Sequence, residues 1–255
     1  MRTVIAAIDD SAAAAPVLGA AVALGHLLDA RVEALHVADD GGQGARAFAE
    51  HLGVPFRRVT GEPLARILAE VAHPSVVAIA VGTRRRLKER GVGHLAQAVV
   101  NTVDKPVLVV PPGASVADRF RTALIAMEGT PEKALAVKTV VELAAGADVE
   151  LVVVHVDDEA SIPSFSDQVA HETEAYAQEF LARYVPGAPR ARFEPRVGHP
   201  AEEIVAATAD VGAEVIALGW RQSPRPDRAL VAREVLERSQ VPVLLVALAG
   251  GGLAE

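Results

Sequence analysis

The stretch TVIAAIDDS at residues 3–11 returns as TALIAMEGT at residues 122–130, which lies 119 positions further along the chain. Each copy leads from a short apolar run to an acidic residue and then to serine or threonine. The same spacing relates LHV at residues 35–37 to VHV at residues 154–156. A shared spacing over two separate motifs indicates that the chain contains one structural unit twice.

The repeat continues toward the end of each copy at a slightly longer spacing. GEP at residues 61–63 matches GHP at 198–200, and PVLVV at 106–110 matches PVLLV at 242–246, at spacings of 137 and 136. The change from 119 to 137 predicts an 18-residue insertion in the second copy, around residues 157–190.

Short apolar runs rich in β-branched residues alternate with segments of helical spacing in both copies. The runs cover residues 4–8, 32–37, 56–59, 76–81 and 107–110, and then 122–127, 149–156, 192–197, 214–218 and 243–246. Because these runs are continuously apolar, we expect strands that are buried on both faces of a parallel sheet covered by helices. The predicted fold is α/β, with two tandem, doubly wound, Rossmann-like domains of five strands each.

The predicted domains are residues 1–113 and 120–248, and residues 249–255 are predicted to form a flexible tail. The linker between the domains is expected at residues 111–118, which contain two prolines and a glycine. The tail is rich in glycine and follows the last apolar run.

The composition excludes several classes of protein. Hydrophobic residues make up 51% of the 255 residues and charged residues 23%, which is typical of a globular chain. The formal net charge of −8 argues against a nucleic-acid binder, because such proteins carry a basic surface for phosphates. The absence of cysteine excludes disulfides, thiolate catalysis and thiolate metal sites.

The sequence also indicates the cellular compartment of the protein. Asp9 and Asp10 interrupt the first apolar run, so the N-terminus lacks the pattern of a secretory signal peptide. The longest uncharged stretch, residues 12–28, contains proline and glycine and is shorter than a membrane span. We therefore expect a cytoplasmic protein that has neither a membrane nor a nucleic acid as its partner.

The candidate site lies at the ends of the predicted strands, because open parallel sheets bind ligands beyond their carboxyl ends, where the strand order reverses. Asp9 and Asp10 follow the first strand, and a carboxylate at this place could accept hydrogen bonds from a ribose or hold a metal; the alternative is a loop acid beside a helix N-terminus. Residues 82–93 follow the fourth strand and precede a helix expected from about His94 to Val103. Five basic residues in this loop could bind an anion, and a solvated loop is the alternative. They are Arg84, Arg85, Arg86, Lys88 and Arg90.

The order of these features resembles the universal stress protein family, in tandem form, over nearly the whole chain. The resemblance rests on Asp9 with Ser11, on Gly82-Thr-Arg after the fourth strand, and on the closing PVLVV at residues 106–110. It implies a five-stranded parallel fold. Because many such proteins pair through their last strands, it also implies an internal pseudo-dimer of the two copies, with a homodimer and an unknown protein partner as further options.

The resemblance also implies a nucleotide site in the first copy, with the acid near the ribose, the backbone after the second strand at adenine, and a glycine-rich loop at the phosphates. It assigns these roles to Asp9, Val37, Gly82, Thr83, Arg84, Gly93 and His94. The loop departs from the family motif, since Arg85 stands at its second glycine and the span from Gly82 to Gly93 is two positions short. In the second copy Gln222 stands at that glycine.

We therefore expect a stress-response binding or regulatory protein, with at most weak binding of ATP or another adenine nucleotide in the first domain and none in the second. It is expected not to be an enzyme, although residual ATPase activity stays open. Two alternatives remain: an ATP- or AMP-binding sensor with slow hydrolysis, and a protein-interaction scaffold without nucleotide.

Histidine spacing predicts no metal site. His155 with Asp157 and Asp158 could ligate a cation, but a histidine partly buried against the next helix is the favoured interpretation. His36 occupies the equivalent place in the first copy, which favours a structural role for both.

Overall fold

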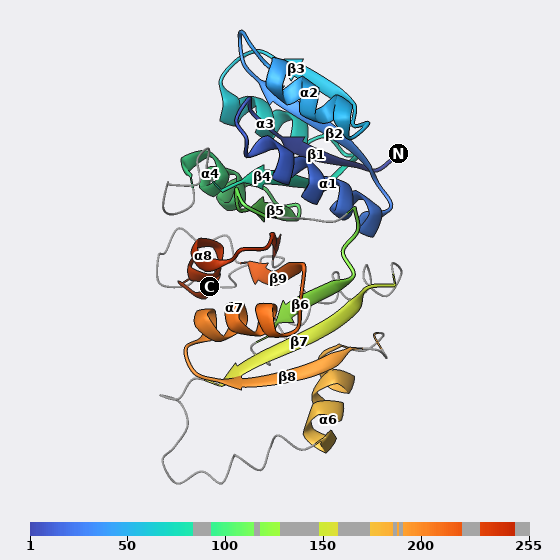
Figure 1. Ribbon diagram of the computed structural model, residues 1–255, viewed down its shortest axis with the longest axis vertical. Coiled ribbons are helices and arrows are strands. Elements are labelled where there is room, and N and C mark those ends of the chain that lie inside the picture. The colour runs from blue at the N-terminus through green and yellow to red at the C-terminus, as the bar shows by residue number, and fades with distance from the viewer. Residues whose placement is uncertain are drawn as a thin grey trace, which may run out of the picture.

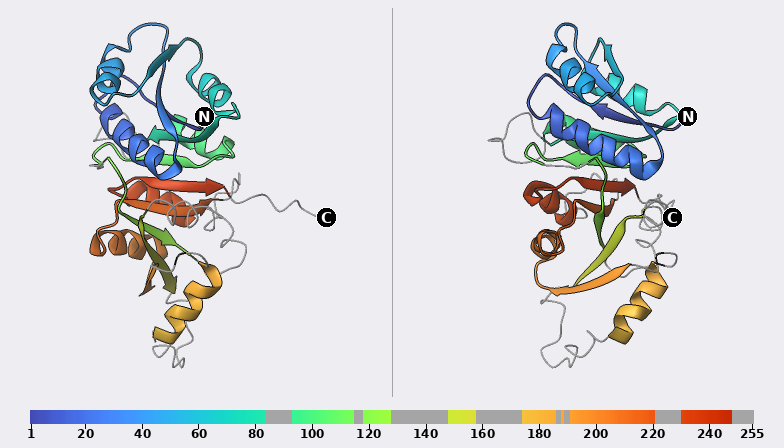
Figure 2. Two further views of the ribbon diagram at one scale, coloured as in Figure 1. Left: turned by 90° about the vertical axis from the view of Figure 1, so that its right-hand side faces the viewer. Right: turned by 45° about the vertical axis from the view of Figure 1, so that its right-hand side comes forward.

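The structure is a computed structural model that describes residues 1–83, 93–114, 118–127, 148–157, 174–185, 188, 191–220 and 230–247. Ten strands in the described residues form a single sheet, with helices on both faces (Figures 1 and 2). None of the helices within these ranges is long and apolar enough to cross a membrane.

The first half alternates strands and helices. Its elements are β1 (Thr3–Ala7), α1 (Ala14–Leu28), β2 (Arg31–Val37), α2 (Gln43–His51), β3 (Phe56–Val59), α3 (Pro63–Val71), β4 (Val76–Gly82), α4 (His94–Thr102) and β5 (Val107–Val110). The five strands are the five predicted from the apolar runs, with small shifts at their ends.

The second half repeats this pattern as far as it is described. Its elements are β6 (Thr122–Ala126), β7 (Glu150–Asp157), α6 (Glu174–Tyr184), β8 (Arg192–Val197), α7 (Pro200–Asp210), β9 (Val215–Trp220), α8 (Leu230–Arg238) and β10 (Val243–Ala247). These strands also match their predicted runs, so the α/β, doubly wound, tandem fold is confirmed. The predicted domain limits, 1–113 and 120–248, stay predictions, and the predicted tail lies outside the described residues.

The strand order is β3-β2-β1-β4-β5-β10-β9-β6-β7-β8. Within each half every pair is parallel, and the order reverses between β1 and β4 and between β6 and β9. The halves join where β5 runs antiparallel to β10, with Leu108 opposite Leu244. The two five-stranded halves therefore form one continuous ten-stranded sheet.

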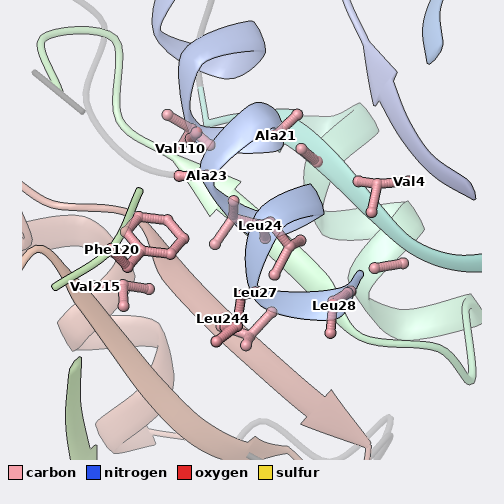
Figure 3. Close-up of a cluster of buried hydrophobic side chains, with 14 of the residues drawn as sticks. Val4, Ala21, Ala23, Leu24, Leu27, Leu28, Val110, Phe120, Val215 and Leu244 are labelled. Carbon is pink, nitrogen blue, oxygen red and sulfur yellow. The ribbon is translucent and has the colours of Figure 1, made fainter. Parts of the chain in front are cut away.

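Two apolar clusters cover the two faces of this sheet, and both cross the join between the halves. One contains residues of α1, α2 and α6, and the other contains residues of α3, α4, α7 and α8. In the first cluster, Leu24 and Leu27 of α1 lie beside Phe120 and Leu244 of the second half (Figure 3). The halves therefore share their core as well as their sheet.

Candidate functional site

A cavity of about 470 Å³ lies at the carboxyl ends of β1, β2 and β4, where the strand order of the first half reverses. It is lined by Ala7, Ile8, Asp9, Ala13, Ala14, Val17, Leu35, Val37, Pro63, Ile67, Val81, Gly82, Thr83, Gly93, His94, Leu95 and Ala96. This is the place at which a doubly wound sheet binds its ligands. Its volume is within the range of small-molecule sites.

The cavity brings together most of the residues that the sequence nominated. Those that line it are Asp9, Val37, Gly82, Thr83, Gly93 and His94. Arg84 and the other basic residues of its loop lie outside the described residues. That the six lining residues bind a ligand stays a prediction.

Asp9 is half-buried at the end of β1, where the residues that follow hold its carboxylate. Its Oδ1 accepts hydrogen bonds from the backbone N–H of Ser11 at 3.0 Å and from the hydroxyl of Ser11 at 2.5 Å. The same hydroxyl accepts the N–H of Ala13 at 3.3 Å, just before α1. Ser11 therefore fixes the carboxylate at the cavity and connects it to the start of a helix.

Thr83 and Gly93 close the neck of the loop between β4 and α4. The carbonyl oxygen of Thr83 accepts the N–H of Gly93 at 2.5 Å, and the N–H of Thr83 donates to Val110 at 2.9 Å. A Cβ atom on Gly93 would lie 2.9 Å from the Thr83 oxygen, so only glycine fits without a shift of the backbone.

Thr83 is the buried polar residue of the cavity lining. Thr83 is 2% exposed, and its Oγ1 has no hydrogen-bond partner among the described residues. A buried hydroxyl without a partner is costly.

Helix α4 begins at the cavity wall. Gly93 is its N-cap, with an extended backbone, and no described side chain caps the helix. His94, Leu95 and Ala96, the first three residues of α4, line the cavity, so the unpaired N–H groups of the first turn lie beside it. A helix N-terminus in this position favours an anion.

Sequence reasoning missed the apolar walls of the cavity. They come from Ala13, Ala14 and Val17 at the start of α1, and from Pro63 and Ile67 at the start of α3. The apolar periodicity of α3 was visible in the sequence, but which apolar side chains face a cavity depends on how each helix is rotated on the sheet.

Asp10 contacts α2, a helix that the sequence did not connect with it. Its Oδ2 accepts the N–H of Gly42 at 2.7 Å and its Oδ1 accepts the N–H of Ala45 at 2.9 Å, so it caps α2 from 32 and 35 residues away. The bond from Ala45, followed by that from Gly42, lowers the pKa of the Asp10 carboxyl below its ordinary value. A helix-terminus role was the alternative for an acid after the first strand, and Asp10 has such a role at α2 rather than at the helix that follows.

His36 and His155 hold equivalent places in the two halves. Nδ1 of His36 lies 2.9 Å from the carbonyl oxygen of Ile8, and Nδ1 of His155 lies 2.8 Å from that of Met127. The predicted structural role is thus confirmed for both.

His155 also meets its neighbours in the way the favoured interpretation expected. It packs on Phe180 of α6 with ring centroids 5.3 Å apart, and its Nε2 lies 3.4 Å from Asp157 Oδ1. Asp158, the other ligand considered, lies outside the described residues. Within the described ranges, no three histidine or carboxylate side chains are grouped so that they could hold a metal ion.

Two of the positions at which the halves can be compared lie outside the described residues. Glu128, the counterpart of Asp9 in the repeat, and Gln222 are not among the described residues. Gly219 and Trp220, the counterparts of Gly82 and Thr83, are described at the end of β9.

One family model and several solved structures match this fold. The model of the universal stress protein family matches residues 119–247. No curated protein matches the chain significantly. A solved universal stress protein from Archaeoglobus fulgidus DSM 4304 has 16% identity and a TM-score of 0.65, over 97% of this chain and 98% of its own. A functionally unknown protein from Pseudomonas aeruginosa PAO1 has 15% identity and a TM-score of 0.67, over 97% of this chain and 93% of its own.

A solved universal stress protein in complex with cAMP is similar to half of the chain, with 21% identity and a TM-score of 0.41, over 51% of this chain and 98% of its own. The two full-length matches have the same fold as both halves together. With the family model on the second half and the same strand order in the first, the chain belongs to the universal stress protein family, as a tandem member.

Proposed function

We propose that the chain is a stress-response binding protein whose first half takes an adenine nucleotide, weakly, in the cavity at the ends of β1, β2 and β4. The observation that carries the proposal is the convergence of Asp9, Thr83 and the N-terminus of α4 on one largely apolar cavity. Apolar walls with a few convergent polar groups are typical of small-molecule sites.

Each part of a nucleotide has a counterpart in this cavity. The apolar side chains of Val17, Val37 and Ile67 suit a planar base. The carboxylate of Asp9 suits the hydroxyls of a ribose, since an ionised carboxylate only accepts hydrogen bonds. The first turn of α4 suits a phosphate, because its N–H groups and the helix dipole favour negative charge.

The same lining supports weak binding. Among the described lining residues there is no lysine or arginine, so the described part of the site offers a phosphate the N–H groups of α4 without a guanidinium or ammonium donor. The Asp9 carboxylate repels a phosphate that approaches it. Both features keep the affinity below that of a site built around charged donors.

A binding role fits the described side chains better than catalysis. The titratable side chains among the described lining residues are Asp9 and His94, and the Asp9 carboxylate accepts two bonds from Ser11. His94 is exposed at the start of α4. A regulatory protein that senses a nucleotide needs no further groups.

Calorimetry on the full chain with ATP, ADP and AMP tests the proposal. We expect one site per chain and a loss of affinity of roughly 10- to 100-fold in Asp9→Asn, because that substitution removes a charged hydrogen-bond acceptor. Asp40→Asn is the matched control, since Asp40 is exposed and does not line the cavity.

The same titrations can contradict the proposal. No heat and no thermal shift with any of the three nucleotides would favour the scaffold alternative. Binding that Asp9→Asn leaves unchanged would place the nucleotide elsewhere. Release of phosphate from ATP, followed in the same samples, decides whether residual hydrolysis accompanies binding.

A further inference from the structure

We propose that the indole of Trp220 fills the place in the second half that corresponds to the cavity of the first half. On this proposal the first-half cavity is open, and the second-half site opens only when this side chain is removed. The inference concerns the second half and holds whichever ligand the first-half cavity takes.

The strand register places Trp220 where Thr83 stands in the first half. Gly82 ends β4 and pairs with Val110 of β5. Gly219 in β9 pairs with Val246 of β10, the counterpart of Val110 in the repeat. Thr83 and Trp220, which follow these glycines, therefore occupy the same place at the carboxyl end of the sheet. Their side chains lie on the same face of the sheet, because side chains alternate along a strand.

The surroundings of Trp220 match the wall of the first-half cavity. That wall includes Leu35, Ile67 and Val81. Their counterparts in the repeat are Val154, Ile204 and Leu218, which are buried and belong to the same apolar cluster as Trp220. Leu35, Ile67 and Val81 are buried in that cluster too, but they also line the cavity, and a threonine rather than an indole stands beside them at position 83.

Thr83 and Trp220 are both buried, but their surroundings differ. Thr83 is 2% exposed beside a cavity, whereas Trp220 is 5% exposed within an apolar cluster. An aromatic side chain buries on the order of 150–250 Å², far more than threonine has to bury. Nε1 of Trp220 has no hydrogen-bond partner among the described residues, so packing rather than a polar contact holds the ring there.

Fluorescence of the full chain gives the first test, because Trp220 is the only tryptophan in the sequence. A ring that fills an apolar site emits at shorter wavelength than tryptophan in water and is poorly quenched by acrylamide. Emission and quenching like those of free tryptophan would overturn the proposal.

Chemical rescue gives the second test. In the full chain, Trp220→Ala should lower Tm, and added indole should raise it again and bind saturably with one site per chain. The unsubstituted protein should show no such shift. Ile216→Ala, a fully buried substitution in the same cluster, is the control and should lower Tm without rescue by indole.

The outcomes are distinct from those of nucleotide binding, because indole is the probe and no nucleotide is present. A Trp220→Ala variant with unchanged Tm and no indole binding would overturn the proposal. If that variant does not fold, Trp220→Leu leaves a smaller space, for which benzene is the probe. The quenching of the unsubstituted chain decides the question independently of either variant.

Discussion

Nδ1 of His36 lies 2.9 Å from the carbonyl oxygen of Ile8. Because a carbonyl only accepts, Nδ1 carries the proton, and the ring ties the end of β1 to β2. His36 is 4% exposed and Ile8 lines the cavity. We expect His36→Ala to lower the free energy of unfolding by about 1–3 kcal/mol, because it leaves a buried carbonyl without its partner. Urea unfolding followed by circular dichroism measures the loss.

The second half offers a matched control for this substitution. His155 makes the same contact with Met127 at 2.8 Å, but its side chain is 15% exposed. His155→Ala should therefore cost less than His36→Ala and should leave the first-half cavity intact. Equal losses from the two variants would mean that burial of the ring does not set the energy of this contact.

The contacts of the Asp10 carboxylate with α2 predict that the stability of the protein depends on pH. Its folded-state pKa lies below the ordinary value of 3.8, because the N–H groups of Ala45 and Gly42 bind the charged form. A group with a lowered folded pKa stabilises the protein above its unfolded pKa, and this contribution is lost as the pH falls through the folded pKa. We therefore expect Asp10→Asn to lower Tm near neutral pH and to lose less Tm than the unsubstituted chain on acidification. Thermal unfolding at several pH values between about 6 and 3 measures both effects.

Asp40→Asn is the control for the pH series. Asp40 lies in the loop before α2 and is exposed, and its carboxylate accepts no hydrogen bond from the described residues. Its substitution should leave the acid transition where it is. A shift as large as that in Asp10→Asn would assign the effect to general charge in the loop rather than to the capping of α2.

The repeat made most of the fold predictable, because each motif fixed a local geometry twice. Gly61 and Gly198 stand at the same place in the two copies, and both adopt a positive φ, of 121° and 144°. The prolines that follow, Pro63 and Pro200, both begin a helix. Such turns depend on residues close in sequence, and the buried parallel strands between them have a continuous apolar pattern.

The site was less predictable from the sequence, because contacts between distant segments decide which side chains line the cavity. Asp9 and Asp10 are adjacent carboxylates with the same local sequence, yet Asp9 lines the cavity and Asp10 caps α2. The position of α2 on the sheet decides between them, and no local pattern encodes it. The burial of the Thr83 hydroxyl likewise depends on the return of the chain to Gly93.

Thr83→Val tests whether the Thr83 hydroxyl contributes to the stability of the protein or to ligand binding. The substitution replaces a buried hydroxyl that has no partner among the described residues with a methyl group. We expect unchanged or higher stability, by up to about 1 kcal/mol, since an unsatisfied buried hydroxyl is costly. If the hydroxyl binds the proposed nucleotide, affinity should fall by roughly 2- to 10-fold in calorimetry. A clear loss of stability would mean that the hydroxyl already has a partner in the folded protein.

Gly93→Ala tests the close approach at the neck of the loop. The new Cβ would lie 2.9 Å from the Thr83 carbonyl oxygen, so the backbone must shift and lengthen the bond between these residues. We expect a loss of about 1–3 kcal/mol in urea unfolding, of the size that overpacking typically causes. Gly53→Ala is a useful comparison, because its strain comes from a φ of 65° and not from a clash. Only Gly93→Ala should also change the binding of a ligand to the cavity.

Leu24 tests whether the two halves unfold together. It lies in α1 of the first half and is fully buried, in one cluster with Phe120 and Leu244 of the second half (Figure 3). Leu24→Ala should cost about 2–5 kcal/mol. Trp220 fluorescence reports only the second half, whereas circular dichroism reports both. Because the halves share a sheet and a core, we expect the two signals to shift together to lower urea. A Trp220 transition that stays in place while circular dichroism splits into two steps would show that each half unfolds alone.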